Sequence, residues 1–281
     1  MNHFKEKIVQ GVFLFTACLT VISVLLICLF LFVSGLPAIK EIGFWSFISG
    51  TVWRPANHLY GILPMIVGSL YVTVGSLLLG VPIGVLTAIF MAYFCPDKLY
   101  KPLKATINLM AGIPSVVYGF FGLVVIVPLI RQQVGGFGMG VLAASILLGI
   151  MILPTIISVS EASLRAVPPS YYEGGLALGA SHERSVFKAV VPAAKRGILS
   201  AIILGVGRAI GETMAVIMVA GNQAVLPQNL TSGVRTLTTN IVMEMGYSSG
   251  LHRRALIATG VVLFVFILII NISFSVINKE D

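Results

Sequence analysis

Residues 140–160 read GVLAASILLGIMILPTIISVS, a stretch without a single charged side chain. A helix rises about 1.5 Å per residue, so about 20 apolar residues cross the roughly 30 Å hydrocarbon core of a bilayer. The stretch therefore predicts a membrane-spanning helix. The whole chain agrees, because 57% of its 281 residues are hydrophobic and only 10% are charged. Soluble domains contain about 25% charged residues, so the composition indicates an integral membrane protein.

Six apolar runs of this kind predict an all-α integral membrane protein with six transmembrane helices. They are residues 11–33, 64–93, 105–130, 140–160, 197–221 and 255–277. The first run follows Lys5 and Lys7 and exceeds the 7–15 apolar residues typical of a signal peptide. We therefore expect an uncleaved N-terminal anchor.

The distribution of Lys and Arg predicts the orientation of these spans. With the N-terminus inside, the inner segments contain eleven basic residues: Lys5, Lys7, Lys98, Lys101, Lys104, Arg165, Arg184, Lys188, Lys195, Arg196 and Lys279. The outer segments contain six: Lys40, Arg54, Arg131, Arg235, Arg253 and Arg254. The bias predicts that both termini are cytoplasmic. Trp45 and Trp53 fall in the first outer segment, where we expect them at the membrane interface.

Glycine and proline residues predict how the spans pack and bend. Gly80 with Gly84, and Gly207 with Gly211, have the small-xxx-small spacing of closely packed membrane helices. Proline residues at 82, 114 and 154 predict kinks or interruptions in the second, third and fourth runs. Whether these serve packing or gating is open at this point.

The sequence contains no pattern for metal or nucleotide chemistry. Its cysteines, Cys18, Cys28 and Cys95, form no CxxC pair, and no HExxH or GxxxxGK[ST] motif is present. Basic residues are scattered between apolar runs, which argues against nucleic-acid binding. We expect no catalytic residue, no metal site and no cofactor site in this chain.

The longest inner segment, 161–197, reads EASLRAVPPSYYEGGLALGASHERSVFKAVVPAAKRG. Ser170 stands three residues before Glu173, which is the capping-box spacing at a helix start. Gly179 is placed to end this short helix in a left-handed conformation. The segment therefore predicts an ordered helix on the cytoplasmic face.

A second helix is predicted immediately after it. Ser181 can cap this helix, and Pro192 interrupts it. Its apolar stripe consists of Val186, Phe187, Val190 and Val191. The pair of helices could lie on lipid, but the first contains few of the basic residues typical of such helices. We therefore favour a surface that docks a protein.

The spacing in this loop resembles the EAA loop of ABC-importer permeases. That family's pattern is Glu-Ala-Ala, three residues, Gly, nine residues and Ile-x-Leu-Pro. This chain keeps the spacing but has glycines for both alanines, Ala189 for the isoleucine and Val191 for the leucine. The resemblance implies a type I ABC importer permease fold whose coupling helix enters a cleft of a separate ATP-binding subunit. Its coupling residues would be Ser170, Glu173, Gly174, Gly175, Gly179 and Pro192.

Four further segments resemble permeases of phosphate-specific importers, most closely the PstC-type subunit. They are NHLYGILPMIVGSLYVT at 57–73, AGIPSVVYGFFGLVVIVPL at 111–129, GRAIGETMAV at 207–216 and SGLHRRALIATG at 249–260. Four such segments in the same order are more specific than any one alone.

Arg208 and Glu212 are charged residues inside the fifth run, where each costs on the order of 2.5–3.5 kcal/mol on insertion scales. They are one helical turn apart, so we expect them to pair. A guanidinium also offers a planar fork that matches phosphate. We therefore assign the substrate pathway to Arg208 and Glu212, together with Thr213 and Ser115 from the matching segments. A purely structural Arg–Glu lock is the alternative.

The resemblance implies a permease subunit that moves inorganic phosphate across the cytoplasmic (inner) membrane and is not itself an enzyme. Residues 1–10 would be a cytoplasmic N-terminus and 11–281 the six-span permease domain, with the coupling loop at 161–196. The implied partners are a PstA-type permease, a dimer of ATP-binding subunits that holds ATP and magnesium, and an extracytoplasmic phosphate-binding protein. The alternatives are a permease for sulfate or molybdate, and a stand-alone channel or secondary transporter.

Overall fold

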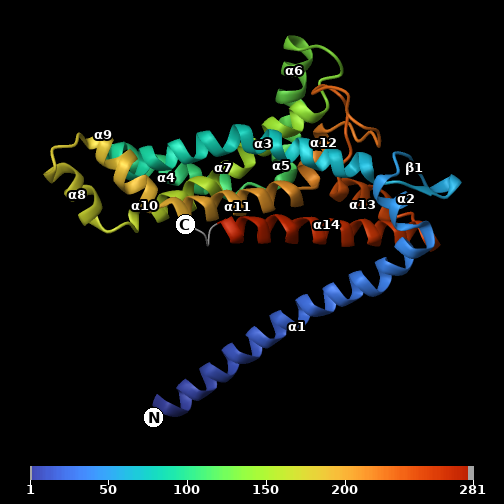
Figure 1. Ribbon diagram of the computed structural model, residues 1–281, viewed down its shortest axis with the longest axis horizontal. Helices are drawn as coiled ribbons and strands as arrows, with labels where there is room; N and C mark the ends of the chain where they lie inside the picture. Colours follow the sequence, from blue (N-terminus) through green and yellow to red (C-terminus); the bar gives the residue numbers. More distant parts are fainter. Residues whose placement is uncertain (1, 278–281) are drawn as a thin grey trace.

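The computed structural model describes the backbone of residues 2–277 and the side chains of residues 6–273. The side chains of Lys5 and Lys279, two of the basic residues counted above, lie outside this part. Within this part the fold is helical apart from one small β-hairpin (Figure 1). Five helices among the described residues are long and apolar enough to cross a membrane, and the number is six if the bent pair His182–Ala193 and Lys195–Gly211 is counted as one span. The expected all-α architecture with up to six spans is therefore confirmed.

The first and last spans cross at one end of the molecule. Helix α1 (Asn2–Ile42) is longer than the predicted run and diverges from the body toward its N-terminus (Figure 1). Helix α14 (Gly250–Ile277) begins a few residues before the predicted sixth run. The two helices touch at Gly35, where a Cβ would lie 2.7 Å from Val261 Cγ2 and 3.2 Å from Ala258 Cα. Glycine is therefore required for this crossing.

The segment between the first two spans is a folded cap. It contains helix α2 (Phe44–Ser49), strand β1 (Trp53–Arg54), the 3₁₀ turn η1 (Pro55–Asn57) and strand β2 (Leu59–Tyr60), with Trp53 paired to Tyr60. Trp45 is 75% exposed, but Trp53 is only 7% exposed and packs in the core. The expectation of an interfacial position is therefore wrong for Trp53. Its indole N–H donates to the buried carboxylate of Glu244, which is described below.

Helices α3 and α7 form the centre of the bundle. Helix α3 (Leu63–Ile89) passes through Pro82 and ends in a π-helical turn, η2 (Phe90–Phe94), and α7 (Val141–Arg165) packs along it. A Cβ at Gly80 would lie 2.7 Å from Ile152, and one at Gly84 2.8 Å from Ile156. These glycines allow the close packing that their spacing predicted.

The third predicted run, 105–130, has the wrong boundary. Residues up to 112 belong to a separate helix, α4 (Asp97–Gly112), and the span itself consists of α5 (Ser115–Phe121), the π-helical turn η3 (Gly122–Ile126) and α6 (Val127–Gln133). The break falls at Ile113, which is extended because proline disfavours a helical conformation in the preceding residue. The interruption expected at Pro114 is confirmed.

The fifth predicted run, 197–221, is not one helix. The segment before it contains α8 (Pro169–Ala177), followed by α9 (His182–Ser185), the π-helical turn η4 (Val186–Val190) and α10 (Val191–Ala193). The chain then bends by 68° into α11 (Lys195–Gly211). Helix α11 ends before Glu212, and α12 (Met214–Val219) begins two residues later. Helix α13 (Leu237–Met245) precedes α14.

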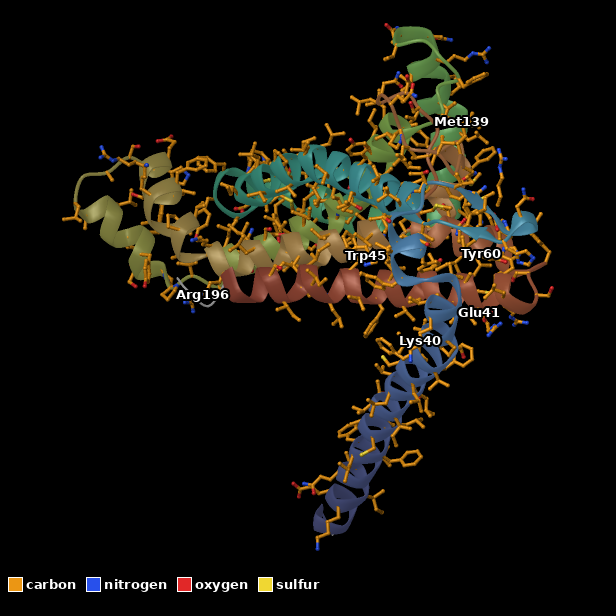
Figure 2. The ribbon with its side chains drawn as sticks, turned by 45° about the vertical axis from the view of Figure 1, so that its right-hand side comes forward. Lys40, Glu41, Trp45, Tyr60, Met139 and Arg196 are labelled. Carbon is orange, nitrogen blue, oxygen red and sulfur yellow. The ribbon has the colours of Figure 1, made fainter. Side chains whose placement is uncertain are left out.

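Three buried clusters hold these elements together. One surrounds α7 and joins α3, α5, α11 and α12. A second joins α1, the hairpin, α13 and α14 at one end, and a third joins α3, α4, η4 and α11 at the other. Figure 2 shows Arg196 at the latter end, while Lys40, Glu41 and Tyr60 lie at the former. Arg196 of the predicted inner set and Lys40 of the predicted outer set thus lie at opposite ends of the bundle.

Candidate functional site

Helix α8 begins differently from the prediction. Its N-cap is Pro168 and its first residue is Pro169, whose fixed φ suits a first turn and whose missing N–H needs no partner there. No side chain caps this helix, so the capping box expected from Ser170 and Glu173 is wrong. Both residues instead lie exposed on the helix.

The end of α8 is as predicted. Gly179 has a φ of +80°, which favours glycine. Its N–H donates to the carbonyl of Leu176 at 2.9 Å, and the N–H of Ala180 donates to that of Gly175 at 3.1 Å. This pair of hydrogen bonds is the Schellman motif, which satisfies the last carbonyls of the helix.

The two glycines that replace the family's alanines have different surroundings. A Cβ at Gly175 would lie 2.7 Å from Ser185 Oγ and 3.0 Å from Ser185 Cβ, so glycine allows α8 to pack closely on α9. A Cβ at Gly174 would meet no atom within 4 Å. Gly174 therefore lies on the open face of α8.

That open face is apolar for an exposed loop. No residue of α8 is buried. Tyr171 and Leu176 are exposed, and Leu178 at the tip is 91% exposed. Such a grouping of large apolar side chains around a short helix is typical of a protein interaction site.

The opposite face attaches the loop to the bundle. The hydroxyl of Tyr172 lies 2.7 Å from His182 Nδ1, and the His182 ring packs 4.6 Å from that of Phe94 at the end of η2. Ser181 caps α9 as predicted, because its Oγ accepts the N–H of Arg184 at 3.3 Å. The loop is therefore attached to the bundle through Phe94, in the π-helical turn that follows α3.

The predicted apolar stripe of the second helix is only partly buried. Val186 and Val190 are fully buried, Val191 is half-buried, and Phe187 is exposed. Pro192 lies in α10, directly before the 68° bend into α11. It therefore marks the junction between the loop and the fifth span.

A buried carboxylate that the sequence analysis did not identify lies beside this junction. Glu161, 2% exposed near the end of α7, accepts hydrogen bonds from Tyr100 Oη at 2.7 Å, Lys104 Nζ at 2.6 Å and Arg165 Nε at 3.0 Å. Arg165 Nη2 also donates to the carbonyl of Met91 at 2.9 Å. One carboxylate thus joins α4, α7 and the end of α3.

The Tyr100 hydroxyl remains a donor in this cluster. Its hydrogen bond to Glu161, followed by burial, raises the pKa of Tyr100 above its usual value. The Arg165 guanidinium lies 4.8 Å from the centre of the Tyr100 ring, within the range of a cation–π contact. The cluster is therefore a rigid joint at the base of the loop.

The structure does not bring Arg208 and Glu212 together as predicted. Among the described residues Arg208 has one hydrogen-bond partner, the hydroxyl of Thr155 on α7, 3.2 Å from its Nη1. Glu212 lies beyond the end of α11, so the one-turn spacing of a helix does not apply to it. Its carboxylate instead accepts the N–H groups of Thr213 at 3.2 Å and Ala215 at 3.1 Å, and thus caps α12.

The other two pathway candidates lie at helix boundaries near this break. The Thr213 hydroxyl donates to the carbonyl of Gly211 at 3.2 Å, within the break itself. Ser115 is the first residue of α5, which packs against α12. Thr213 at the start of α12 and Ser115 at the start of α5 therefore belong to two helices that pack together.

Gly207 and Gly211 do not pack as their spacing predicted. A Cβ at either position would meet no atom within 4 Å among the residues that the structure describes. This face of α11, next to Arg208, is left open within the chain.

A second buried carboxylate at the opposite end of the bundle was also missed. Glu244 accepts hydrogen bonds from Arg235 Nη1 at 2.7 Å and Trp53 Nε1 at 2.8 Å, and His252 Nε2 lies 2.9 Å from it. Arg235 also donates to the carbonyl of Asn222 at 3.1 Å. Glu244 therefore joins the hairpin, α13, α14 and the loop after α12.

Comparison with known proteins agrees with this architecture. Residues 80–280 match the family described as binding-protein-dependent transport system inner membrane component. The probable ABC transporter permease protein YqgH of Bacillus subtilis is 40% identical over 276 residues, covering 94% of this chain and 89% of that protein. The phosphate transport system permease protein PstC of Haemophilus influenzae is 32% identical over 288 residues, covering 94% and 91%.

A solved structure extends the comparison of folds. A chain of a bacterial ABC transporter involved in the import of the acidic polysaccharide alginate superposes with a TM-score of 0.66. The match covers 99% of each chain, with 17% sequence identity. At this identity the likeness concerns the fold alone.

Proposed function

This chain belongs to the family of binding-protein-dependent transport system inner membrane components, and we propose that it translocates inorganic phosphate across the cytoplasmic membrane. It is an ABC permease with the fold of type I importers. The phosphate assignment is supported by relatives such as the Haemophilus influenzae PstC protein.

The observation that carries the proposal is the environment of Arg208. Its guanidinium lies within a membrane span. Its one hydrogen bond to the part of the chain that the structure describes goes to a neutral hydroxyl and leaves most of its five donors unused. A cation without a counter-ion inside the hydrocarbon region has a high free energy unless an anion or water binds to it. A guanidinium binds phosphate through two parallel hydrogen bonds. Arg208 thus meets the requirement for a transient phosphate site.

Thr213 and Ser115 would complete this site. Both carry hydroxyl groups that donate to phosphate oxygens, and both stand at interruptions of membrane helices. Glu212 has a different role in the proposal, because its carboxylate caps α12. A carboxylate that accepts hydrogen bonds from backbone N–H groups repels a passing anion less than a carboxylate without such partners would.

The exposed face of α8 would couple this pathway to ATP hydrolysis. Glu173, Gly174 and the tip at Gly179 would enter a cleft of an ATP-binding subunit, which holds ATP and magnesium. This proposal is supported by the apolar exposure of Leu178 and by the anchoring of the loop through His182. Ser170 and Pro192 would frame the coupling segment at its two ends.

The complete transporter would contain further chains. We propose a PstA-type permease against the open face of α11, a pair of ATP-binding subunits at the α8 end and a phosphate-binding protein at the hairpin end. Both termini of this chain would then be cytoplasmic, in accordance with the basic-residue bias.

The substrate is tested with the complete complex in proteoliposomes, supplied with its binding protein and ATP. We expect ATP-dependent uptake of radiolabelled phosphate that unlabelled sulfate or molybdate in tenfold excess does not reduce. Uptake of sulfate or molybdate in preference to phosphate would assign the permease to another oxyanion. Uptake without ATP-binding subunits would instead indicate a channel or secondary transporter.

A further inference from the structure

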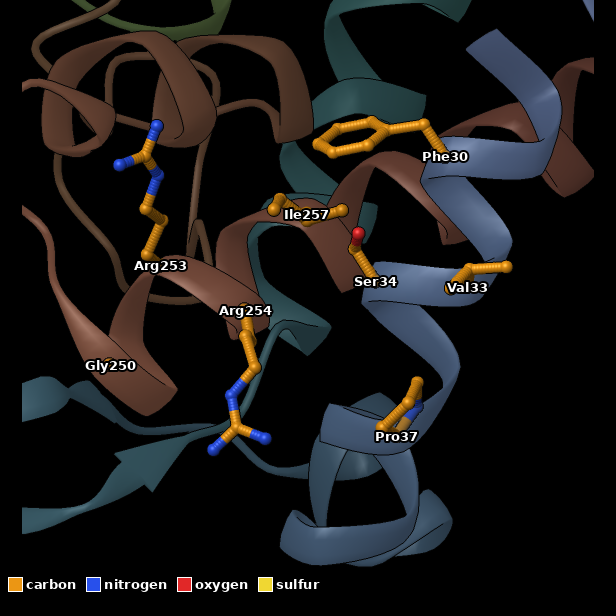
Figure 3. A pocket seen from close by; sticks show the side chains of 8 residues that line it. All are labelled: Phe30, Val33, Ser34, Pro37, Gly250, Arg253, Arg254 and Ile257. Carbon is orange, nitrogen blue, oxygen red and sulfur yellow. The ribbon is translucent and has the colours of Figure 1, made fainter. Parts of the chain in front are cut away.

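A cavity of about 400 Å³ lies beside the crossing of α1 and α14 (Figure 3). Its lining residues on α1 are Phe30, Val33, Ser34 and Pro37, and those on α14 are Gly250, Arg253, Arg254 and Ile257. Neither the proposed phosphate pathway nor the coupling loop uses it. Its lining combines apolar side chains with two consecutive arginines.

The apolar part of the cavity belongs to membrane-spanning helices. Phe30 is 61% exposed and Val33 is 64% exposed on α1, within its long apolar run. In Figure 3 the side chains of Phe30 and Ser34 point toward Ile257 on α14. The helices touch at Gly35, so the cavity is a recess alongside a packed seam.

The charged part of the cavity is not neutralised within the chain. Arg253 has no hydrogen-bond or ion-pair partner for its guanidinium among the described residues. Arg254 Nη2 pairs with Glu41 at 2.9 Å, but the Arg254 side chain remains 44% exposed. Glu41 does not itself line the cavity. The lining therefore contains two guanidinium groups and no carboxylate, which favours an anionic ligand.

The charged and apolar parts of the lining are separated along the helices. On α1 the lining runs from Pro37 to Phe30, about 10 Å toward the middle of the span at 1.5 Å per residue. On α14 it runs from Arg253 one turn inward to Ile257. A ligand that fits must therefore be anionic at the end of the span and apolar toward its middle.

Two polar groups of α1 without partners lie between these parts. Pro37 has no N–H, so the carbonyl of Val33 lacks the usual hydrogen bond from four residues later. The Ser34 hydroxyl, which also lines the cavity, has no partner among the side chains described. These groups suit the glycerol and ester region of a lipid.

We propose that this cavity binds one anionic phospholipid. The phosphate of the headgroup contacts Arg253 and Arg254, the glycerol region lies at Ser34, and an acyl chain lies along Phe30, Val33 and Ile257. An acidic protein partner would match the arginines, but a water-soluble surface would not cover the apolar wall inside the span. The bound lipid would join the N-terminal anchor to the last span.

The test uses the complete transporter complex, delipidated in detergent and analysed by native mass spectrometry. Phosphatidylglycerol and phosphatidylcholine with identical acyl chains are titrated separately. We expect preferential binding of phosphatidylglycerol, and about tenfold or more weaker binding after the double change Arg253→Gln with Arg254→Gln. The matched control is Arg54→Gln with Arg131→Gln, two exposed arginines away from the cavity, which should leave binding unchanged.

A second variant fills the cavity without changing its charge. Ser34→Trp should weaken phosphatidylglycerol binding by about tenfold while the complex remains assembled. Millimolar inorganic phosphate should not displace the lipid, and displacement would identify a site for free phosphate instead. Equal binding of both lipids, or unchanged phosphatidylglycerol binding in both variants, would overturn the proposal. So would a double arginine variant that loses affinity only for the binding protein, since this result would identify a protein-docking surface.

Discussion

The carboxylate of Glu212 accepts the backbone N–H of Ala215 at 3.1 Å, across the break between α11 and α12. A glutamate inside an apolar segment therefore serves the start of a helix instead of neutralising the nearest arginine. The Thr238 hydroxyl donates to the carbonyl of Glu212 at 3.2 Å and ties the break to α13. The interruption of the fifth span is thus stabilised by hydrogen bonds of its own.

This arrangement predicts different effects for two changes at Glu212. Glu212→Gln keeps a side-chain oxygen that can accept the N–H groups of α12, whereas Glu212→Ala leaves them without that acceptor. Loss of a cap costs about 0.5–2 kcal/mol, so we expect the Ala variant to melt several degrees lower and the Gln variant to stay near the parent. Thermal unfolding of the purified complex measures this. Equal destabilisation by both changes would indicate that the negative charge, and hence an ion pair, matters.

The Glu161 cluster predicts a local loss of stability. Glu161→Gln removes the charge that Lys104 and Arg165 share while keeping the side chain's shape. Because both cations are partly exposed, we expect a cost of about 1 kcal/mol, which lowers the melting temperature by roughly 2–4 °C. The matched control is Asp97→Asn, an exposed carboxylate outside the proposed coupling segment that should leave the melting temperature nearly unchanged. Identical melting of both variants would remove Glu161 from the structural joint.

The tip of the coupling loop predicts a functional loss without a structural one. Leu178 is 91% exposed, so Leu178→Asp should not change the stability of this chain. A buried interface with an ATP-binding subunit would disfavour the new charge, and we expect at least a tenfold fall in binding-protein-stimulated ATPase activity. Phe137→Asp, at an 86% exposed position in the loop before α7, is the control. Full stimulation in Leu178→Asp would exclude this tip from the docking surface.

The orientation predicts which positions thiol reagents reach. Single cysteines are placed at Lys188 and Phe137 in a chain without Cys18, Cys28 and Cys95. A membrane-impermeant maleimide added to spheroplasts should label position 137 and spare position 188 until the cells are lysed. Arg235 is unsuitable for this purpose, because its side chain is only 15% exposed and pairs with Glu244. The reverse pattern of labelling would invert the topology.

Much of this fold was predictable because apolar length and turn chemistry are local properties. Residues 141–160 lie within α7, and Gly179 and Ser181 perform the capping roles that their positions predict. The glycines at 80 and 84 meet α7 because close packing of membrane helices requires small side chains. Such signals require no knowledge of distant parts of the chain.

The predicted boundaries of the third and fifth spans were wrong because the chain changes direction there within a continuously apolar stretch. Helix α4 was merged into the third span because only Pro114 marks its end, and α11 was joined to α12 because the break at Glu212 contains no proline or charged run. The start of α8 was misassigned because Pro169 served as the first helical residue in place of a capping serine.

The buried carboxylates were missed because their partners are distant in sequence. Glu161 meets Lys104 from 57 residues away, and Glu244 meets Trp53 from 191 residues away. The spacing of Glu161 and Arg165, four residues apart at the end of an apolar run, was a usable signal. The whole chain contains only ten acidic residues, so each of them was a candidate for a specific structural or functional role.

If phosphate contacts Arg208 during transport, phosphate uptake should depend on the side chain at this position. Arg208→Lys keeps one positive charge without the planar fork, and Arg208→Gln removes the charge. A hydrogen bond to a charged group contributes about 1.5–3 kcal/mol, so we expect phosphate uptake per assembled complex to fall roughly ten- to hundredfold in Arg208→Gln and less in Arg208→Lys. Thr155→Val, which removes the one hydrogen-bond partner of Arg208 among the described residues, is the control and should retain most uptake. Near-parental phosphate uptake by Arg208→Gln in fully assembled complexes would contradict the account.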